Sequence, residues 1–150
     1  MLKAQDIMIR TVVTAKASDT IKELARMLID HRISGAPVTD EQGNLLGIVT
    51  ENDLISQNKR LHIPTVLRLF DAYIMLESPD KIDKEIRKIA AVTVGDICTR
   101  DVITVAEDTP LEEVAAIMSE KNVHLIPVVR DKKILGIIGK MDLIVGMLKK

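Results

Sequence analysis

The chain contains 150 residues, of which 47% are hydrophobic and 29% are charged, and its formal net charge is −1. This balance is typical of a globular protein with one compact unit or two very small ones, and it excludes a disordered chain. The lack of a basic surplus argues against a protein that holds nucleic acid or acidic membranes by charge alone.

The first half of the chain predicts the element order β-α-β-β-α. Residues 12–15 (VVTA) form a β-branched run that predicts a strand. Apolar residues recur at helical spacing in residues 19–32, which indicates an amphipathic helix. Two apolar runs flank a polar turn in residues 36–49, which is the pattern of a β-hairpin, and residues 50–57 then predict a second helix.

Residues 56–91 form an insert with a helical pattern of its own. Prolines open two predicted helices, at residues 64–77 and 80–91. The single phenylalanine and the single tyrosine of the chain, Phe70 and Tyr73, both lie here. A packed helical linker is the simplest interpretation. The alternative is that both rings contribute to an oligomer or partner surface, where aromatic side chains are enriched.

The second half of the chain repeats the same order of elements. Residues 102–105 (VITV) predict a strand, residues 109–122 an amphipathic helix, residues 126–138 a hairpin and residues 140–150 a final helix. The helix at 109–122 carries a clear start signal, made of an N-cap, a proline in the first turn and a capping box: Thr109, Pro110 and Glu112.

The two halves are copies of one another. At offsets of 90 and then 89 residues they align, so that GIVTENDL at 47–54 meets GIIGKMDL at 136–143. Two copies of about 50 residues favour a pseudo-twofold pair over a solenoid. We therefore expect an α/β (α+β) fold in which repeat 1, residues 2–55, and repeat 2, residues 92–148, pack into one compact pair with the helical insert between them.

The repeated phrase ends a buried strand and opens a helix. The simpler interpretation of Thr50 and Asp53 is a capping box that satisfies free N–H groups of the helix. The functional interpretation uses the same geometry, because a helix N-terminus suits a phosphate and a threonine hydroxyl adds a donor. An aspartate one turn into the helix would accept hydrogen bonds from the two hydroxyls of a ribose. The two roles are compatible.

The stretch HRISGAPVTDEQGNLLGIVTENDL, and later KNVHLIPVVRDKKILGIIGKMDL, resembles the CBS (cystathionine β-synthase) domain in both copies. The small residues before Pro37 and Pro127, the hairpin and the G-h-h-T/S-x-x-D ending match in order. The resemblance covers residues 2–55 and 92–148 and identifies a tandem CBS pair, or Bateman module. It implies a regulatory protein that binds an adenosine-containing ligand, AMP, ADP or ATP in the first place, with S-adenosylmethionine or a cyclic dinucleotide as alternatives.

The resemblance also implies two clefts between the repeats, each with the T/S-x-x-D phrase of one repeat and an adenine-binding wall from the other. The residues implied for the first cleft are Ile48, Thr50, Asn52, Asp53, Cys98, Ile103, Val123, His124 and Leu125. The residues implied for the second cleft are Met8, Val13, Ile33, Ser34, Gly35, Ile137, Gly139, Lys140, Met141 and Asp142. In this assignment Asp53 and Asp142 hold the ribose.

The two implied clefts are not equivalent. The first offers the Thr50 hydroxyl and His124 to a phosphate, whereas the second has Gly139 and Ser34 at those positions. A lost charge-assisted hydrogen bond costs on the order of 1.5–3 kcal/mol, so we expect the first cleft to bind a phosphorylated adenosine about tenfold or more tightly. A close backbone approach at Gly139 and the charge of Lys140 favour the opposite order.

Other functional classes find little support in the sequence. The histidines show no metal-ligand spacing and there is no P-loop or activated nucleophile, so we expect no metal, no catalytic cofactor and no enzyme activity. The resemblance implies a homodimer with an unknown protein target, and a dimeric scaffold with empty clefts is the alternative function. The single cysteine, the absence of a signal-peptide pattern and the absence of an apolar run near the roughly 18 residues of a membrane helix favour a soluble cytoplasmic protein. The scarcity of aromatic side chains argues against nucleic-acid binding.

Overall fold

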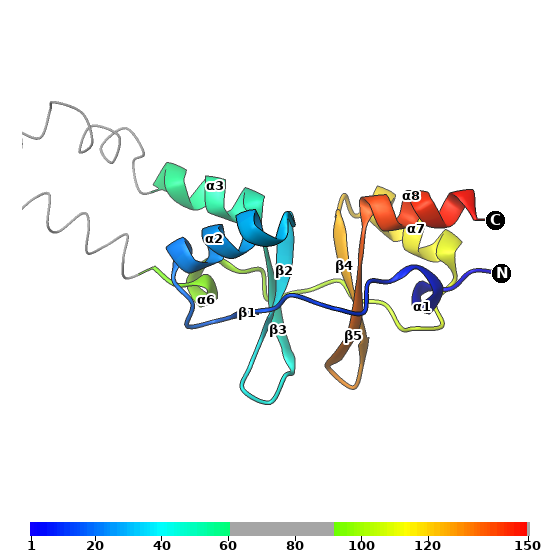
Figure 1. Cartoon of the computed structure of the whole chain (residues 1–150), viewed down its shortest axis with the longest axis horizontal. Helices are drawn as coiled ribbons and strands as arrows, with labels where there is room; N and C mark the ends of the chain where they lie inside the picture. The colour runs from blue at the N-terminus through cyan, green and yellow to red at the C-terminus, as the bar shows by residue number, and fades with distance from the viewer. Residues whose placement is uncertain (61–91, 150) are drawn as a thin grey trace, which may run out of the picture. The chain divides into compact units, whose positions relative to one another are not determined.

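A computed structural model of the chain describes residues 1–60 and 92–149. The predicted insert helices at 64–77 and 80–91, with Phe70 and Tyr73, lie outside the described residues. In chain order the elements are α1 (Ala4–Ile7), β1 (Ala15–Lys16), α2 (Ile21–His31), β2 (Gly35–Thr39), β3 (Leu45–Thr50), α3 (Glu51–Arg60), α6 (Val94–Ile97), α7 (Leu111–Glu120), β4 (Leu125–Arg130), β5 (Lys133–Gly139) and α8 (Lys140–Leu148) (Figure 1). The mixture of helices and strands confirms the predicted α+β class. No helix in the described ranges is both long and apolar enough to cross a membrane.

Within the described residues the predicted helices are confirmed as α2, α3, α7 and α8, and the two predicted hairpins as β2–β3 and β4–β5. Helix α2 starts as its sequence suggests, because the Thr20 hydroxyl oxygen accepts a hydrogen bond of 3.1 Å from the backbone N–H of Glu23. It ends at His31, and the C-cap residue Arg32 adopts the left-handed conformation with φ of 53°. Strands β1, β2 and β3 form one sheet in that order, and β4 pairs with β5 in a second, antiparallel sheet.

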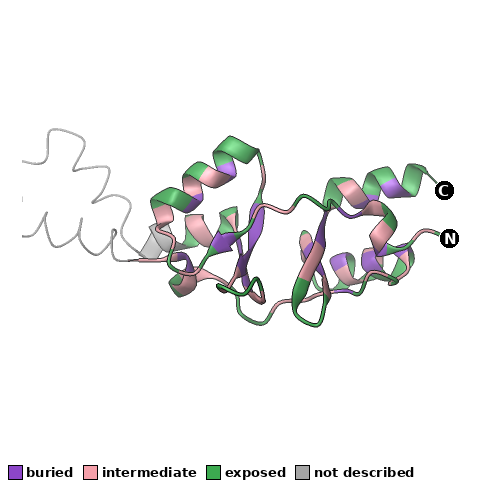
Figure 2. Ribbon diagram, turned by 60° about the horizontal axis from the view of Figure 1, so that its bottom comes forward, coloured by how far each residue is buried: buried purple, intermediate pink, exposed green. Residues whose placement is uncertain are grey.

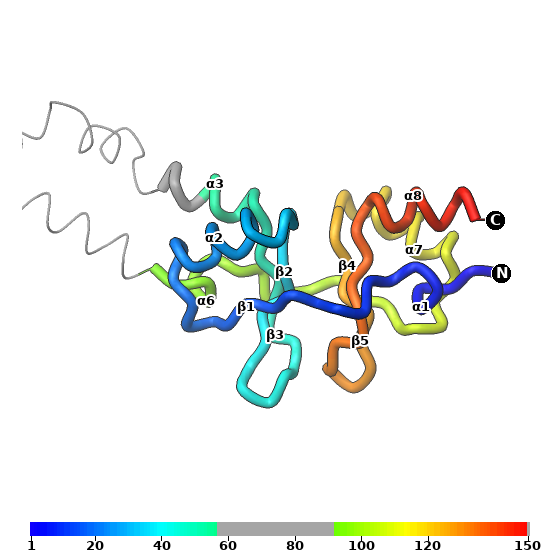
Figure 3. Tube along the Cα trace, in the orientation of Figure 1, coloured from blue at the N-terminus to red at the C-terminus, as the bar shows by residue number. Residues whose placement is uncertain are grey.

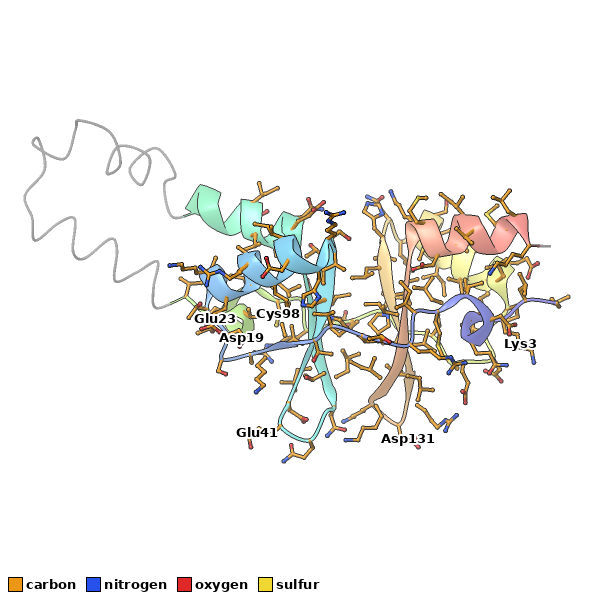
Figure 4. All side chains as sticks on the ribbon, viewed as in Figure 1. Lys3, Asp19, Glu23, Glu41, Cys98 and Asp131 are labelled. Atoms are coloured by element: carbon orange, nitrogen blue, oxygen red, sulfur yellow. The ribbon has the colours of Figure 1, made fainter. Side chains whose placement is uncertain are left out.

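The two hairpin turns differ in length and chemistry. Asp131 and Lys132 form the two-residue turn between β4 and β5, and both have positive φ, as a tight hairpin turn of this hand requires. In the longer β2–β3 turn, the Asp40 carboxylate accepts hydrogen bonds from the backbone N–H groups of Asn44 (2.8 Å) and Gln42 (2.9 Å). The hydrogen bond from Asn44 is the main reason that the pKa of Asp40 lies below its ordinary value. Figure 4 shows Asp131 and Glu41 at the tips of their hairpins.

The prediction of β-branched strands at residues 12–15 and 102–105 is largely wrong. Strand β1 contains only Ala15 and Lys16, and residues 102–105 form no strand beyond an isolated parallel bridge between Val105 and Val128. In that bridge the Val105 N–H donates to the carbonyl of Pro127, and its carbonyl accepts from the N–H of Val129. A longer parallel ladder would need an N–H on Pro127, which proline lacks, so the pairing stops after one bridge. Pro37 occupies the corresponding place in β2.

The predicted capping box of α7 is also wrong. The N-cap of this helix is Pro110, and no side chain caps it. The Thr109 hydroxyl oxygen instead accepts a hydrogen bond from the backbone N–H of Ala106, at 3.1 Å. The first helical N–H, of Leu111, donates to the carbonyl of Leu2 at 3.0 Å. A segment far away in the sequence therefore satisfies the N–H group that a local cap would have served.

The chain packs into two compact units that do not coincide with the sequence repeats. Among the described residues, unit 1 consists of residues 1–14, 39–47 and 100–149, and unit 2 of residues 15–38, 48–60 and 92–99. The first 14 residues of the chain thus belong with most of repeat 2. Figure 3 shows this N-terminal segment in blue beside α8 in red, and α1 packs against α8. The Ala4 N–H also donates to the Thr109 carbonyl, just before α7, at 2.8 Å.

The start of repeat 2 is exchanged in the same way. Helix α6 packs against β1 and α3 of unit 2. The Val94 N–H donates to the Asp19 carbonyl, and the Gly95 N–H donates to the Ala17 carbonyl, both at 2.9 Å. The short helix that begins each repeat therefore packs with the main body of the other repeat. Neither α1 nor α6 was predicted as a helix from the sequence.

Each unit has its own apolar core, seen as the purple segments of Figure 2. In unit 1, helices α1, α7 and α8 and the β4–β5 hairpin enclose the core residues Ala4, Met8, Val105, Leu111, Val114, Met118, Ile126, Val128, Ile138 and Leu143. In unit 2, the buried apolar residues are Ala15, Leu24, Leu28, Ala36, Val38, Val49 and Val94. Burial of these side chains is the main favourable contribution to the stability of each unit.

Candidate functional site

In unit 2, Thr50 and Asp53 stand where β3 ends and α3 begins. The Asp53 carboxylate oxygen Oδ2 accepts a hydrogen bond from the Thr50 backbone N–H at 2.8 Å, and the Thr50 hydroxyl donates to the same oxygen at 3.3 Å. Both residues are half-buried. The carboxylate thus closes the start of the helix, as the capping interpretation predicts. We call Thr50 and Asp53 the unit 2 site.

In unit 1, Gly139 and Asp142 occupy the corresponding place where β5 meets α8. Asp142 Oδ2 accepts a hydrogen bond from the Gly139 backbone N–H at 2.8 Å. Leu125, the first residue of β4, is the direct partner of Gly139 in the hairpin. All three residues are half-buried. We call Leu125, Gly139 and Asp142 the unit 1 site.

The same carboxylate cap recurs away from these two sites. Asp6 accepts from the Lys3 N–H at 2.8 Å at the start of α1, and Asp96 accepts from the Thr93 N–H at 2.9 Å at the start of α6. The cap is therefore a general structural device of this chain and is not by itself a sign of binding. Within residues 1–60 and 92–149, however, Asp53 and Asp142 form no hydrogen bond or ion pair through Oδ1. One oxygen of each carboxylate remains for a ligand.

Unit 2 brings several more of the residues predicted for the clefts close to its site. The Glu51 N–H, at the start of α3, donates to the carbonyl of Ser34 at 2.8 Å. Ile48 and Thr99 exchange two backbone hydrogen bonds of 2.9 and 2.8 Å, which places Cys98 next to the strand that carries Thr50. Figure 4 shows Cys98 at the end of α6. The predicted site residues that unit 2 contains are Ile33, Ser34, Gly35, Ile48, Thr50, Asn52, Asp53 and Cys98.

Unit 1 contains the other predicted site residues. They are Met8, Val13, Ile103, Val123, His124, Leu125, Ile137, Gly139, Lys140, Met141 and Asp142. Ile9 and Ile137 exchange two backbone hydrogen bonds of 2.8 and 2.9 Å, so the segment after α1 runs along β5. The buried Met8 side chain lies over Gly136, where a Cβ would stand only 2.6 Å from its sulfur atom. Each predicted cleft thus draws residues from both units, and the cleft assignments stay predictions.

A cavity of about 290 Å³ lies in unit 1 between α1 and α8. Two predicted site residues, Met8 and Asp142, line it. The other lining residues, which the sequence reasoning missed, are Asp6, Ile7, Val145, Gly146 and Lys149. The signal that would have found the α8 residues is helical spacing, because positions 145, 146 and 149 follow Asp142 at i+3, i+4 and i+7. No group of three or more metal-ligating side chains occurs in the part of the chain that the structure describes.

Comparison with known proteins places the chain in a family. The CBS domain family matches it twice, over residues 4–59 and 94–149. The chain belongs to the CBS domain family. The two matches in tandem make it a CBS pair, as the repeated phrase predicted.

Two solved CBS pairs share the fold over almost the whole chain. One is the CBS domain pair of protein MJ0100 in complex with 5′-methylthioadenosine and S-adenosyl-L-methionine, which is 30% identical, with a TM-score of 0.72, and the match covers 100% of this chain and 99% of that one. The other is CBSX2 of Arabidopsis thaliana in complex with AMP, which is 24% identical, with a TM-score of 0.76, and the match covers 99% of this chain and 98% of that one. At 24% identity, the similarity to CBSX2 shows the fold alone.

One curated relative is an enzyme of which the CBS pair is only a part. L-aspartate semialdehyde sulfurtransferase of Methanocaldococcus jannaschii is 32% identical over 143 residues, which are 93% of this chain but 22% of the enzyme. The chain therefore spans about a fifth of that relative. CBS pairs of this kind are regulatory modules. The chain also matches protein MJ1426 of Methanocaldococcus jannaschii at 29% identity, over 96% of this chain and 90% of that protein.

Proposed function

We propose that this CBS pair binds an adenosine-containing small molecule and acts as its sensor, with Asp53 and Asp142 holding the ribose. The observation that carries the proposal is the pair of half-buried carboxylates at equivalent helix N-termini, each with Oδ1 available. An ionised carboxylate accepts hydrogen bonds only, and two vicinal hydroxyls are suitable donors to it. The MJ0100 domain pair, bound to two adenosine derivatives, supports the adenosine class.

An adenine nucleotide is the proposed ligand of the unit 2 site. The Glu51 N–H already donates to the Ser34 carbonyl, so the donors to a phosphate would be the next N–H groups in the first turn of α3 and the Thr50 hydroxyl, once it turns away from Asp53. We also assign His124 and the apolar residues predicted for the first cleft to this ligand site. Ser34 and the other residues predicted for the second cleft belong to the second ligand site. No catalytic role is proposed for the chain, so its output passes to another protein or another part of a larger one. We place it in the cytoplasm because its single cysteine favours a reducing compartment.

A second copy of the chain is the proposed partner, and α8 is the surface that it would contact. Met141 is 67% exposed and Leu148 is 82% exposed, and Ile144 and Val145 lie between them on the same face of the helix. The equivalent positions of α3 carry Asn52, Ile55 and Ser56, so the apolar face is particular to α8. An exposed apolar face of this kind marks an interaction site. In a twofold dimer this one face is enough to form the interface, because the same surface of each copy contacts that of the other.

A thermal-shift screen tests the proposed function. AMP, ADP, ATP, S-adenosylmethionine and 5′-methylthioadenosine would be added to the folded protein, with guanine nucleotides as controls. A ligand that binds only the folded state stabilises it by roughly 2.7 kcal/mol at a hundredfold excess over Kd. We expect a shift with at least one adenosine compound and none with the guanine nucleotides. No shift with any compound would favour a dimeric scaffold whose aspartates serve only as helix caps.

A further inference from the structure

The cavity between α1 and α8 in unit 1 carries three charged side chains, which belong to Asp6, Asp142 and Lys149. Each aspartate uses its Oδ2 atom to cap the start of a helix. In the ranges 1–60 and 92–149, neither Oδ1 atom accepts a hydrogen bond, and the Lys149 ammonium makes no hydrogen bond or ion pair. Both carboxylates and the ammonium are therefore available to a ligand.

The rest of the cavity wall is apolar. It consists of Ile7, Met8, Val145 and Gly146. Gly146 lets α1 approach α8 closely, because a Cβ at this position would stand 2.6 Å from Ile7 Cγ2. The positions of repeat 1 that correspond to 145 and 146 hold Ser56 and Gln57, so this apolar part of the α8 wall is particular to repeat 2.

The charges on the α8 wall stand at its two ends. Asp142 lies in the first turn of α8, and Lys149 is the C-cap residue of the same helix. They are about two turns apart, so they lie on one face, separated by about 10 Å along the helix axis. Helical side chains lean toward the N-terminus, which brings the long Lys149 side chain over the cavity that both residues line. This wall therefore has an acidic end, an apolar middle and a basic end.

We propose that this cavity binds a small zwitterion with an apolar side chain, of the class of the aliphatic α-amino acids. The ammonium group of the ligand donates to the carboxylates of Asp6 and Asp142, and its carboxylate accepts from Lys149. Its side chain covers the apolar wall. The volume of about 290 Å³ is close to the lower limit of ligand pockets, which measure about 300–1,000 Å³, so the occupant is small.

Simpler ligands match this cavity less well. A phosphate or another anion would meet two carboxylates. An amine without a carboxylate would leave the charge of Lys149 unpaired. An uncharged molecule would displace water from all three charged groups without replacing the hydrogen bonds to charge that the water made. A zwitterion alone pairs with charges of both signs.

The inference goes beyond the proposed function, because the ligand is not an adenosine compound. Met8 and Asp142 are shared with the predicted second cleft, whereas the other residues that line the cavity belong to neither predicted cleft. Asp142 has one carboxylate oxygen left beside its helix cap. A ribose and an amino acid therefore exclude one another at Asp142, and the unit 2 site is independent of the cavity.

Calorimetric titration of the whole protein with L-leucine tests the inference. Three analogues each remove one feature of the ligand: L-leucinamide lacks the carboxylate, 4-methylpentanoate lacks the ammonium group, and glycine lacks the apolar side chain. We expect leucine to bind at least about tenfold more tightly than each analogue, since each loses a charge-assisted hydrogen bond or the apolar contact. No adenosine compound is added, so the result does not depend on the proposed function.

Two variants locate the binding site. Asp6→Asn and Lys149→Gln should each weaken leucine binding by about tenfold or more, because each removes one charge from the cavity. The asparagine still offers an oxygen to the Lys3 N–H, so α1 keeps its cap. The matched controls are Asp96→Asn, at the cap of α6 in unit 2, and Lys121→Gln, at the C-cap of α7. Both controls should bind leucine as tightly as the unmodified protein.

Three results would overturn the inference. The first is a folded protein that does not bind leucine. The second is an analogue that binds as tightly as leucine, since the feature it lacks would then not be recognised. The third is unchanged leucine affinity in folded Asp6→Asn and Lys149→Gln, or an equal loss in their controls, which would place the amino acid elsewhere. In each case the separate titration with adenosine compounds would still decide the proposed function.

Discussion

Asp53 has a structural role as well as its proposed binding role, and the two can be separated by experiment. Asp53→Ala removes the cap from α3, which should lower the free energy of unfolding by about 1 kcal/mol. It should also weaken binding of an adenine nucleotide by about tenfold or more, since the ribose loses a charged acceptor. Denaturant unfolding and calorimetric titration measure the two effects.

Asp19→Ala is the matched control for Asp53→Ala. The Asp19 carboxylate also accepts a local backbone hydrogen bond, of 2.9 Å from the Lys16 N–H, and closes the turn after β1 in the same unit. We expect a comparable loss of stability and unchanged affinity. If both variants bound the nucleotide equally well, Asp53 would be a helix cap and nothing more.

Two glycines of unit 1 should respond differently to the same substitution. Gly136→Ser would push a Cβ against Met8 and should lower the free energy of unfolding by about 1–3 kcal/mol, as overpacking does. Gly139→Ser meets no close neighbour and adds a good N-cap residue, so its effect should stay within about 0.5 kcal/mol. Thermal and chemical unfolding of both variants would show the difference, and equal destabilisation would contradict the packing described here.

At the scale of single residues, the repeated phrase was the strongest signal in the sequence. It located Asp53 and Asp142 at helix starts, and the structure confirms their caps. The phrase T-V-G-D at 93–96 is a similar signal, and Asp96 does cap α6 by accepting from the Thr93 N–H at 2.9 Å. The cap at Lys3 was harder to foresee, because lysine is not a capping residue and only its backbone N–H takes part.

The short helices α1 and α6 make the clearest element-scale prediction, because each packs with the other repeat. Ala4 and Val94 are equivalent positions, and both are 0% exposed. Ala4→Asp should loosen unit 1, so hydrogen exchange should rise in α7 and α8. Val94→Asp should raise it in α2 and α3 instead. Each variant buries an unpaired charge, which costs about 3–5 kcal/mol.

An increase in hydrogen exchange in the helices of the same repeat, instead of those of the other repeat, would contradict this packing. In that case Ala4→Asp would affect α2, the next long helix along the chain. Milder variants, Ala4→Ser and Val94→Ser, keep the comparison possible if the aspartate variants fail to fold.

Helix α8 carries the proposed self-association face. Replacing Ile144 and Leu148 together with lysine should turn a dimer into a monomer in sedimentation experiments, since like charges would replace apolar contact. Ile29→Lys is the control, because Ile29 is an apolar side chain of α2 that is 74% exposed. A dimer that survives the double substitution would place the interface elsewhere.

Elements with strong local signals were predictable and those that depend on distant partners were not. The helical spacing in α2 and α7 and the paired apolar runs of the hairpins identified these elements. The β-branched runs at 12–15 and 102–105 misled, because a strand needs a partner that can donate, and Pro127 lacks the N–H that would extend the ladder. The helix start at Leu111 depends on Leu2, which no local pattern around Thr109 reveals.

For the whole molecule, self-similarity revealed the tandem CBS pair but not how the chain divides into compact units. A repeat in sequence fixes the order of elements. The exchange of α1 and α6 follows from contacts such as that between the Ala4 N–H and the Thr109 carbonyl, which join residues about a hundred positions apart. The tip of the β2–β3 hairpin likewise belongs to unit 1, because the Leu45 N–H donates to the Lys132 carbonyl at 2.9 Å.

The most direct measurement of the central claim is a calorimetric titration of the whole protein with AMP and with 5′-methylthioadenosine. It would compare the unmodified chain with the double variant Asp53→Ala and Asp142→Ala, and with Asp19→Ala as the folded control. We expect both compounds to bind the unmodified chain and Asp19→Ala, and neither to bind the double variant. Unchanged binding by a folded double variant would contradict the assignment of the ribose to these two aspartates.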